Sequence, residues 1–162
     1  MNNHRLKGLA SEMLFAARWY ELVEDESLTL ITPDLDTGWD FMIASSGIKI
    51  QVKRWKRKTN QNKWNLDIRR KRNSGTGNYT GKEFDYIAIH NTETDKFIIA
   101  DIAQLINEDT GKVKQNFSIN ALTNLGMCHL VEVSQGLASA VPFCYNTKVI
   151  KGHPNEVQSS TV

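Results

Sequence analysis

The residues best suited to chemistry lie on two neighbouring segments, 39–43 (Trp-Asp-Phe-Met-Ile) and 48–53 (Ile-Lys-Ile-Gln-Val-Lys). Asp40 opens the first segment, and Gln51 and Lys53 lie two apart in the second. Successive side chains of a strand point to opposite faces, so Gln51 and Lys53 are expected on one face. Carboxylate and amide oxygens bind hard cations, and a lysine stabilises developing negative charge. We interpret the three residues as a candidate metal-and-lysine site.

Two strands joined by a tight turn would bring these residues together. Residues 44–47 (Ala-Ser-Ser-Gly) form the short polar connection typical of a β-hairpin. The alternation of Ile50 and Val52 with polar neighbours is equally typical of a plain amphipathic strand with one wet face. On the hairpin alone, this simpler interpretation is favoured, so the surrounding elements must decide.

The first of these elements is a helix predicted over residues 4–24. Apolar residues recur at helical spacing on one side of it, which we expect to face the core: Leu6, Leu9, Met13, Ala16, Tyr20 and Val23. Glu12 lies near the edge of this stripe, where a carboxylate is expected to be half-buried. Taken alone, a glutamate in this place is more often an ordinary flank residue.

The remaining pattern predicts a mixed α/β (α+β) fold, a central β-sheet flanked by helices. Strands are expected at Leu28–Ile31, Lys63–Arg70, Phe84–His90, Phe97–Ala100 and Cys128–Val133, and Asp101 is the expected N-cap of a helix through Ile106. We expect one domain over residues 1–162, with its core at about 4–133 and a weakly patterned extension at 134–162.

Composition excludes several classes of protein. The chain has 162 residues, of which 40% are hydrophobic and 23% charged, as in ordinary globular domains. No apolar run reaches the roughly 18 to 20 residues that cross a membrane. The two cysteines form no disulfide framework, so a cytoplasmic protein is expected. The four histidines are scattered without the spacing of zinc ligands, so a zinc site is not expected.

Positive charge is concentrated in one segment. Residues 49–72 contain 11 of the 20 basic residues and a single acidic one, Asp67, so the rest of the chain is net acidic. Such density favours nucleic acid as a partner over a merely solvated loop. The expected DNA-contacting residues are Arg54, Lys56, Arg57, Lys58, Lys63, Arg69, Arg70, Lys71 and Arg72.

Together these residues resemble the PD-(D/E)XK nuclease superfamily, whose fold many restriction endonucleases and junction resolvases share. The resemblance covers residues 5 to 106 approximately, and its motif is short and degenerate. Its order is a glutamate in the first helix (Glu12), an aspartate opening a core strand (Asp40) and an X-x-Lys ending the next (Gln51 to Lys53). The later strand pair, 84–89 and 97–99, also resembles the core strands of the superfamily.

The sequence departs from the superfamily pattern at two places. The literal Pro33-Asp34 dipeptide precedes the strand in a turn, so Asp40 is the preferred aspartate, with Asp34 and Asp36 as lesser candidates. Gln51 stands where the superfamily has Asp or Glu, which removes one negative charge from the site. A Gln-x-Lys variant of the motif is similar to that of the group I intron-encoded homing endonuclease branch. The alternative is that Gln51 is an inactivating substitution of a glutamate.

The resemblance implies a Mg²⁺- or Mn²⁺-dependent, site-specific endonuclease on double-stranded DNA, of the intron-homing type. Asp40, Gln51 and Glu12 would bind the metal, and Lys53 would complete the catalytic set. A single active site per chain implies a homodimer or homotetramer for double-strand cleavage. The alternatives are a structure-specific nuclease of the Holliday-junction resolvase type and a DNA-binding module without catalysis.

Overall fold

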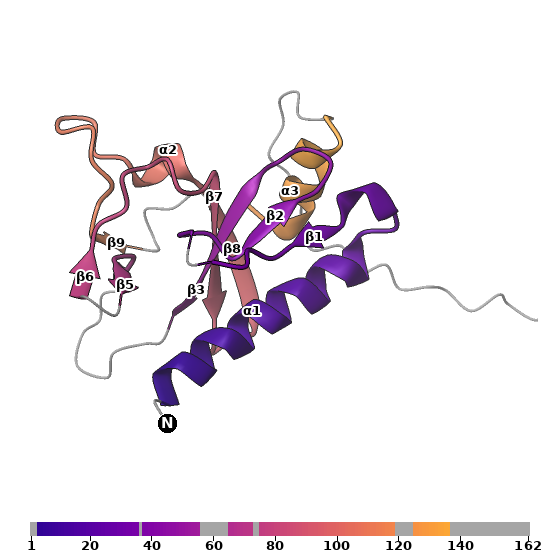
Figure 1. Ribbon diagram of the computed structural model, residues 1–162, viewed down its shortest axis with the longest axis horizontal. Coiled ribbons are helices and arrows are strands. Elements are labelled where there is room, and N and C mark those ends of the chain that lie inside the picture. The colour runs from indigo at the N-terminus through magenta and orange to yellow at the C-terminus, as the bar shows by residue number, and fades with distance from the viewer. Residues whose placement is uncertain (1–2, 36, 56–64, 73–74, 119–124, 137–162) are drawn as a thin grey trace, which may run out of the picture.

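A five-stranded mixed sheet forms the centre of the computed structural model, which describes residues 3–35, 37–55, 65–72, 75–118 and 125–136 (Figure 1). The strands lie in the order β1-β2-β3-β7-β8. They comprise β1 (Leu30–Ile31), β2 (Phe41–Ile43), β3 (Lys49–Trp55), β7 (Tyr86–Asn91) and β8 (Lys96–Asp101). β3 and β7 are parallel, while the other neighbouring pairs are antiparallel. The predicted mixed sheet is confirmed, including the hairpin that carries Asp40 and Gln51.

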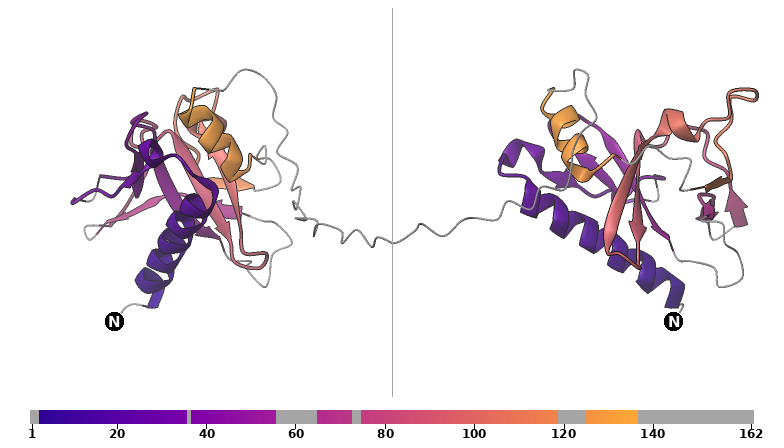
Figure 2. Two further views of the ribbon diagram at one scale, coloured as in Figure 1. Left: turned by 90° about the vertical axis from the view of Figure 1, so that its right-hand side faces the viewer. Right: turned by 180° about the vertical axis from the view of Figure 1, so that it is seen from behind.

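Two helices cover one face of this sheet. α1 (Asn3–Leu22) packs against β3 and β7, and α3 (Met127–Ser134) packs against β8. Figure 2 shows both helices from two further directions. Their shared core joins aromatic side chains of α1 to aliphatic side chains of the sheet and α3, among them Phe15, Trp19, Phe41, Ile50, Val52 and Leu130.

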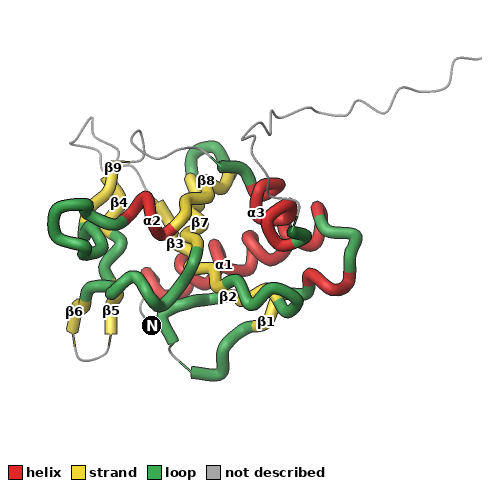
Figure 3. Tube along the Cα trace, turned by 90° about the horizontal axis from the view of Figure 1, so that it is seen from above, coloured by secondary structure: helices red, strands yellow, loops and turns green. Residues whose placement is uncertain are grey.

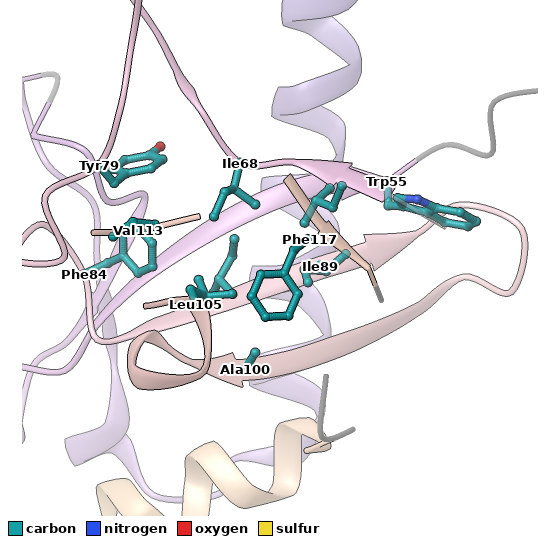
Figure 4. Close-up of a cluster of buried hydrophobic side chains, with 11 residues drawn as sticks. Trp55, Ile68, Tyr79, Phe84, Ile89, Ala100, Leu105, Val113 and Phe117 are labelled. Atoms are coloured by element: carbon teal, nitrogen blue, oxygen red, sulfur yellow. The ribbon is translucent and has the colours of Figure 1, made fainter. Parts of the chain in front are cut away.

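The opposite face is covered by short elements. These are α2 (Ile102–Leu105), capped by Asp101 as predicted, and a two-stranded sheet of β4 (Asn65–Asp67) and β9 (Asn116–Ser118). A second small hairpin pairs β5 (Arg70–Arg72) with β6 (Gly75–Gly77), and η1 (Glu26–Leu28) follows α1. Figure 3, viewed from above, places β4, β5, β6 and β9 to one side of the central sheet. Figure 4 shows the core beneath them, with Tyr79 and Phe84 at one end and Trp55 at the other.

The orientation of α1 differs from the prediction. Phe15 and Trp19 are fully buried, whereas Leu6, Leu9, Met13 and Tyr20 are about half exposed or more. The helix thus has two apolar sides, and the side with the large aromatic rings, which bury the most area per residue, faces the sheet. Trp19 also donates its indole N–H to the carbonyl of Leu28 at 2.8 Å, which fixes this rotation.

Two predicted strands are also wrong. Cys128–Val133 lies inside α3, because its apolar residues pack on one helical side and not on alternate faces. Lys63–Arg70 is no continuous strand: within the described residues β4 ends at Asp67 and β5 begins at Arg70. Among the described helices, none has the length and apolar character needed to cross a membrane.

Candidate functional site

The candidate site lies where β2 ends and leaves the edge of β3 open. β2 pairs with β3 only through Phe41 opposite Ile50 and Met42 opposite Lys49. Asp40, just before β2, donates its backbone N–H to Ile50 at 2.9 Å. Its carboxylate oxygen Oδ2 then accepts the backbone N–H of Val52 at 2.7 Å. A side chain thus takes the place of the next backbone partner, and this fixes Asp40 against β3.

Gln51 is buried beside this carboxylate. Its amide nitrogen donates to Asp40 Oδ2 and, at 3.0 Å, to the carbonyl oxygen of Val52. Its amide oxygen accepts the hydroxyl of Tyr79 at 3.3 Å. Only 6% of Gln51 is exposed, so the face of β3 that was expected to be in solvent is covered by Tyr79, which is itself 5% exposed. Burial makes every polar partner in this group costly to lose.

Lys53 and Glu12 join the group from the two sides of the open edge. The Lys53 ammonium lies over the Tyr79 ring, 5.4 Å from its centroid. Burial raises the pKa of the Glu12 carboxyl, and the positive charge of Lys53 acts in the opposite direction. Glu12 comes from α1, on the other face of the sheet, and interacts with Lys53 because β2 does not extend between them. The four predicted residues therefore gather at one strand edge.

The donor set fits a hard divalent cation in part. Asp40 Oδ2 and the Val52 carbonyl oxygen both accept from the Gln51 amide nitrogen, so these two oxygens lie close to one point. A cation at that point would be attracted by both. Rotating the Gln51 amide by half a turn would present its oxygen there and its nitrogen to the Tyr79 hydroxyl. Among the described residues, no three His, Cys, Asp or Glu side chains gather as they would around a metal. The site offers mixed oxygen donors and not an acidic cluster.

Sequence reasoning missed two features of the site region. Tyr79, which bonds Gln51 and underlies Lys53, lies in a loop where no periodicity marks it. The second feature is a chain of bonds, buried at Ser11 and His90, that ties α1 to the β7–β8 hairpin. In it, Ser11 Oγ lies 2.8 Å from His90 Nδ1, and His90 Nε2 lies 3.0 Å from an oxygen of Asp95. Ser11 directly precedes Glu12, so this chain fixes the part of α1 that carries the glutamate.

The predicted DNA-contacting residues are only partly placed. Arg54 follows Lys53 on β3 and donates to the carbonyl of Lys7 at 3.3 Å. Arg69 forms a bidentate pair with Asp67, with bonds of 2.9 and 2.7 Å. Arg70, Lys71 and Arg72 form β5. Lys56, Arg57, Lys58 and Lys63 lie outside the described residues.

The structure describes one of the two lesser aspartate candidates. Asp34 is an exposed loop residue, and Asp36 lies outside the described residues. Asp85 accepts the backbone N–H of Lys49 at 2.8 Å, so it closes the start of β3 onto the loop before β7. Among the aspartates on the described part of this hairpin region, Asp40 is the one bonded to Gln51.

Comparison with solved structures supports the fold. The chain is similar to the bacterial homing endonuclease I-Ssp6803I, with a TM-score of 0.54, 18% identity, and coverage of 73% of this chain and 78% of that one. A weaker match to MepB has a TM-score of 0.38, 13% identity, and coverage of 73% and 80%, too low for a conclusion about fold. No protein-family model and no curated protein sequence matches.

The first match confirms the restriction-endonuclease-like core predicted from the sequence. The chain therefore shares the fold of that structure, a mixed five-stranded sheet with flanking helices. At this level of identity, the similarity establishes architecture, and function must be argued from the residues of the site.

Proposed function

We propose that this chain is a Mg²⁺- or Mn²⁺-dependent, site-specific endonuclease that hydrolyses double-stranded DNA, of the homing type. The observation that carries the proposal is the gathering of Asp40, Gln51, Lys53 and Glu12 at the open edge of β3. It occurs in a fold similar to that of a homing endonuclease and at the start of the most basic segment of the chain, residues 49–72. The similarity to a homing endonuclease supports the homing type.

In this proposal Asp40 and Gln51 hold the cation, with Glu12 binding it directly or through water. The bound cation would lower the pKa of a water molecule and offset charge on the scissile phosphate. Asp40 is preorganised for this role by its bond from the Val52 backbone. Tyr79 orients the Gln51 amide, and its ring keeps the Lys53 ammonium close to the site.

Lys53 supplies the positive charge in the reaction. Its ammonium group would orient the attacking water or stabilise the negative charge that builds on the phosphate oxygens. The aromatic ring beneath it contributes an attractive face without neutralising it. Lys53 also interacts electrostatically with the Glu12 carboxylate, which would help to hold its ammonium group at the site.

The basic segment would hold the DNA next to this site. Arg54 follows Lys53 on β3, which ends at Trp55, and further basic residues follow in the sequence. These side chains would contact phosphates, so binding should weaken steeply as salt rises. Because one chain carries one such site, cutting both strands requires a homo-oligomer of at least two chains.

A panel of DNA substrates tests the proposal. The chain is incubated with plasmid, linear and four-way-junction DNA, with and without Mg²⁺, beside the Lys53→Ala variant. We expect Mg²⁺-dependent cuts at defined positions in linear duplex, lost in Lys53→Ala while DNA binding is retained. Normal cutting by the variant would refute the role of Lys53, and cleavage of the junction alone would support the resolvase type.

One observation favours a second candidate, a DNA-binding module without catalysis. Gln51 brings no charge, and its amide nitrogen bonds the carboxylate that would hold the cation. In this case the chain would bind DNA with the same salt dependence and cut none of the three substrates. The same panel therefore separates the two functions.

A further inference from the structure

The outer side of α1 carries an apolar stripe that faces away from the sheet. Leu6, Leu9, Met13 and Tyr20 are 49%, 48%, 66% and 51% exposed. Ala10 and Ala17 are also exposed and lie between them on the same side of the helix. Single exposed apolar residues are ordinary, but a continuous stripe along a 20-residue helix marks an interaction surface.

The spacing of the stripe is that of a helix made to pack on another helix. Leu6, Leu9 and Met13 follow the three- and four-residue steps of a coiled-coil seam, and Tyr20 lies one heptad beyond Met13. The stripe is also symmetric about Met13. Leu6 and Tyr20 lie seven residues to either side of it, and Leu9 and Ala17 lie four to either side. Two copies running antiparallel about Met13 would therefore place a large residue opposite a large one at the ends and Leu9 opposite the small Ala17.

Charge along α1 favours the antiparallel direction. The helix has no acidic residue in its first turn and no basic residue in its last. Arg5 and Lys7 instead lie near its start, and Glu21 and Glu24 lie at and just beyond its end. This distribution opposes the helix dipole, so it weakens the isolated helix. An antiparallel neighbour would place each basic end beside an acidic end and the two dipoles head to tail.

We infer that α1 is the interface through which two copies of this chain pair, antiparallel, along the stripe of Leu6, Leu9, Met13 and Tyr20. The occupant is a second copy because the stripe matches its own reverse in both size and charge, which an unrelated segment has no need to do. Lys7 and Glu21 lie two heptads apart and hence on nearly the same side of the helix. In the pair, Lys7 of one copy would lie near Glu21 of the other, which also accepts a hydrogen bond of 2.7 Å from Arg18 of its own chain. The inference requires no nuclease activity.

Sedimentation velocity on the full chain, without DNA or divalent cation, tests the interface. We expect an assembly of two chains, twice 18.4 kDa, at micromolar concentration, or of four if such pairs associate further. Leu9→Glu with Met13→Glu should reduce the assembly to half its size and leave the circular dichroism spectrum unchanged. Leu35→Glu, at an apolar loop residue that is 78% exposed, is the matched control and should leave the assembly intact.

Charge reversal tests the direction of packing. Lys7→Glu and Glu21→Lys should each weaken association by roughly tenfold, and the two together should restore it. A wild-type monomer at high micromolar concentration, as expected if residues 137–162 cover the stripe instead, would overturn the inference. An assembly that survives Leu9→Glu with Met13→Glu would overturn it as well. Failure of the double reversal to restore association would contradict the antiparallel direction.

Discussion

At the scale of single residues, the account depends on the bonds that Gln51 makes. Its amide joins Asp40 to Tyr79, so the group is satisfied without a cation. A glutamate at this position would lose the donor to Asp40 and place a second negative charge against it. The same glutamate would add a second carboxylate beside Asp40 and so strengthen the attraction of the site for a cation. The identity of this one residue therefore sets the balance between stability and metal binding.

We predict that Gln51→Glu destabilises the cation-free protein by about 1–3 kcal/mol, because a buried donor is replaced by a like charge. Mg²⁺ should recover much of this loss, since it would bind between the two carboxylates. Urea unfolding with and without Mg²⁺ measures both effects. The control is Gln115→Glu, an exposed site where neither effect is expected. Equal stability of Gln51→Glu and wild type without Mg²⁺ would contradict the bonding described for Gln51.

At this scale, the sequence predicted which side chains lie near one another where they follow a strand. Asp40, Gln51 and Lys53 were identified because alternation and hairpin pairing bring them together, and both are local rules. Tyr79 could not be found in this way. It lies 28 residues beyond Gln51 in the sequence. Its position depends on how the loop before β7 packs, where the Tyr79 and Phe84 ring centroids are 5.0 Å apart. Long-range packing of this kind leaves no period in the sequence.

At the scale of elements, the bond chain of Ser11, His90 and Asp95 joins three parts of the fold. It runs from α1 through β7 to the turn before β8, where Asp95 adopts a left-handed conformation with φ of 55°. His90 is 8% exposed and also stacks on Phe97. The chain holds α1, and with it Glu12, in place on the sheet.

We predict that His90→Ala lowers the free energy of unfolding by about 2–4 kcal/mol, because it leaves buried Ser11 with fewer partners and removes a packed ring. Hydrogen exchange in the middle of α1 should also become faster than in the wild type. His4→Ala, at an exposed residue of the same helix, should change neither quantity. Unaltered exchange in α1 of His90→Ala would show that the bond chain does not anchor the helix.

The loop before β7 is stabilised by hydrogen bonds to the side chain of Glu83. The Glu83 carboxylate accepts the backbone N–H groups of Thr80, Gly81 and Lys82 at 3.0–3.2 Å, and the Thr80 hydroxyl at 3.0 Å. Partial burial alone would raise the pKa of Glu83, but these hydrogen bonds outweigh it and hold the pKa below its usual value. Because this loop carries Tyr79 to the site, its order bears on Gln51 as well.

We predict that Glu83→Ala costs about 1 kcal/mol of stability at neutral pH, as for loss of a helix cap. A depressed carboxyl pKa contributes stability that is present above the unfolded-state pKa and is lost as the pH falls through the folded-state value. The difference between variant and wild type should therefore shrink below about pH 4. Urea unfolding at pH 7 and pH 3 measures it. A difference that stays constant with pH would contradict the role of the carboxylate.

The first helix shows what element-level patterns can and cannot decide. Its existence was predictable from the 3.6-residue period, but its orientation was not, because α1 has apolar residues on two sides. Phe15 and Trp19 select the buried side through contacts with β2 and β8, including Phe15 to Phe41 and Phe15 to Phe97, each 5.5 Å between ring centroids. Of the stripe that marked the helix in the sequence, Leu6, Leu9, Met13 and Tyr20 are left exposed, whereas Ala16 and Val23 pack against the core.

At the scale of the whole molecule, the mixed central sheet and its two hairpins, β2–β3 and β7–β8, were predictable, and the structural match confirms the core. The covering elements were not. β4 pairs with β9, Leu66 opposite Phe117, so neither three-residue strand is defined by its own neighbours in sequence. Short strands that depend on distant partners carry too little alternation to be recognised alone.

The molecule thus places its mixed carboxylate, amide and lysine group at a gap in the sheet, between a helix on one face and a small β layer on the other. Glu12, on α1, interacts electrostatically with Lys53. The basic segment begins at the same edge. This arrangement is the basis for assigning a phosphodiester-cleaving role to the site.

The most direct test of the central claim is the rate of Mg²⁺-dependent DNA cleavage by Asp40→Asn and by Asp34→Asn. Asparagine at position 40 preserves the acceptor for Val52 and removes the charge that would hold the cation, whereas Asp34 is an exposed aspartate outside the group. The account predicts that Asp40→Asn loses cleavage by at least about a hundredfold while still binding DNA, and that Asp34→Asn cuts like the wild type. Normal cleavage by Asp40→Asn, or loss of cleavage in Asp34→Asn alone, would contradict it.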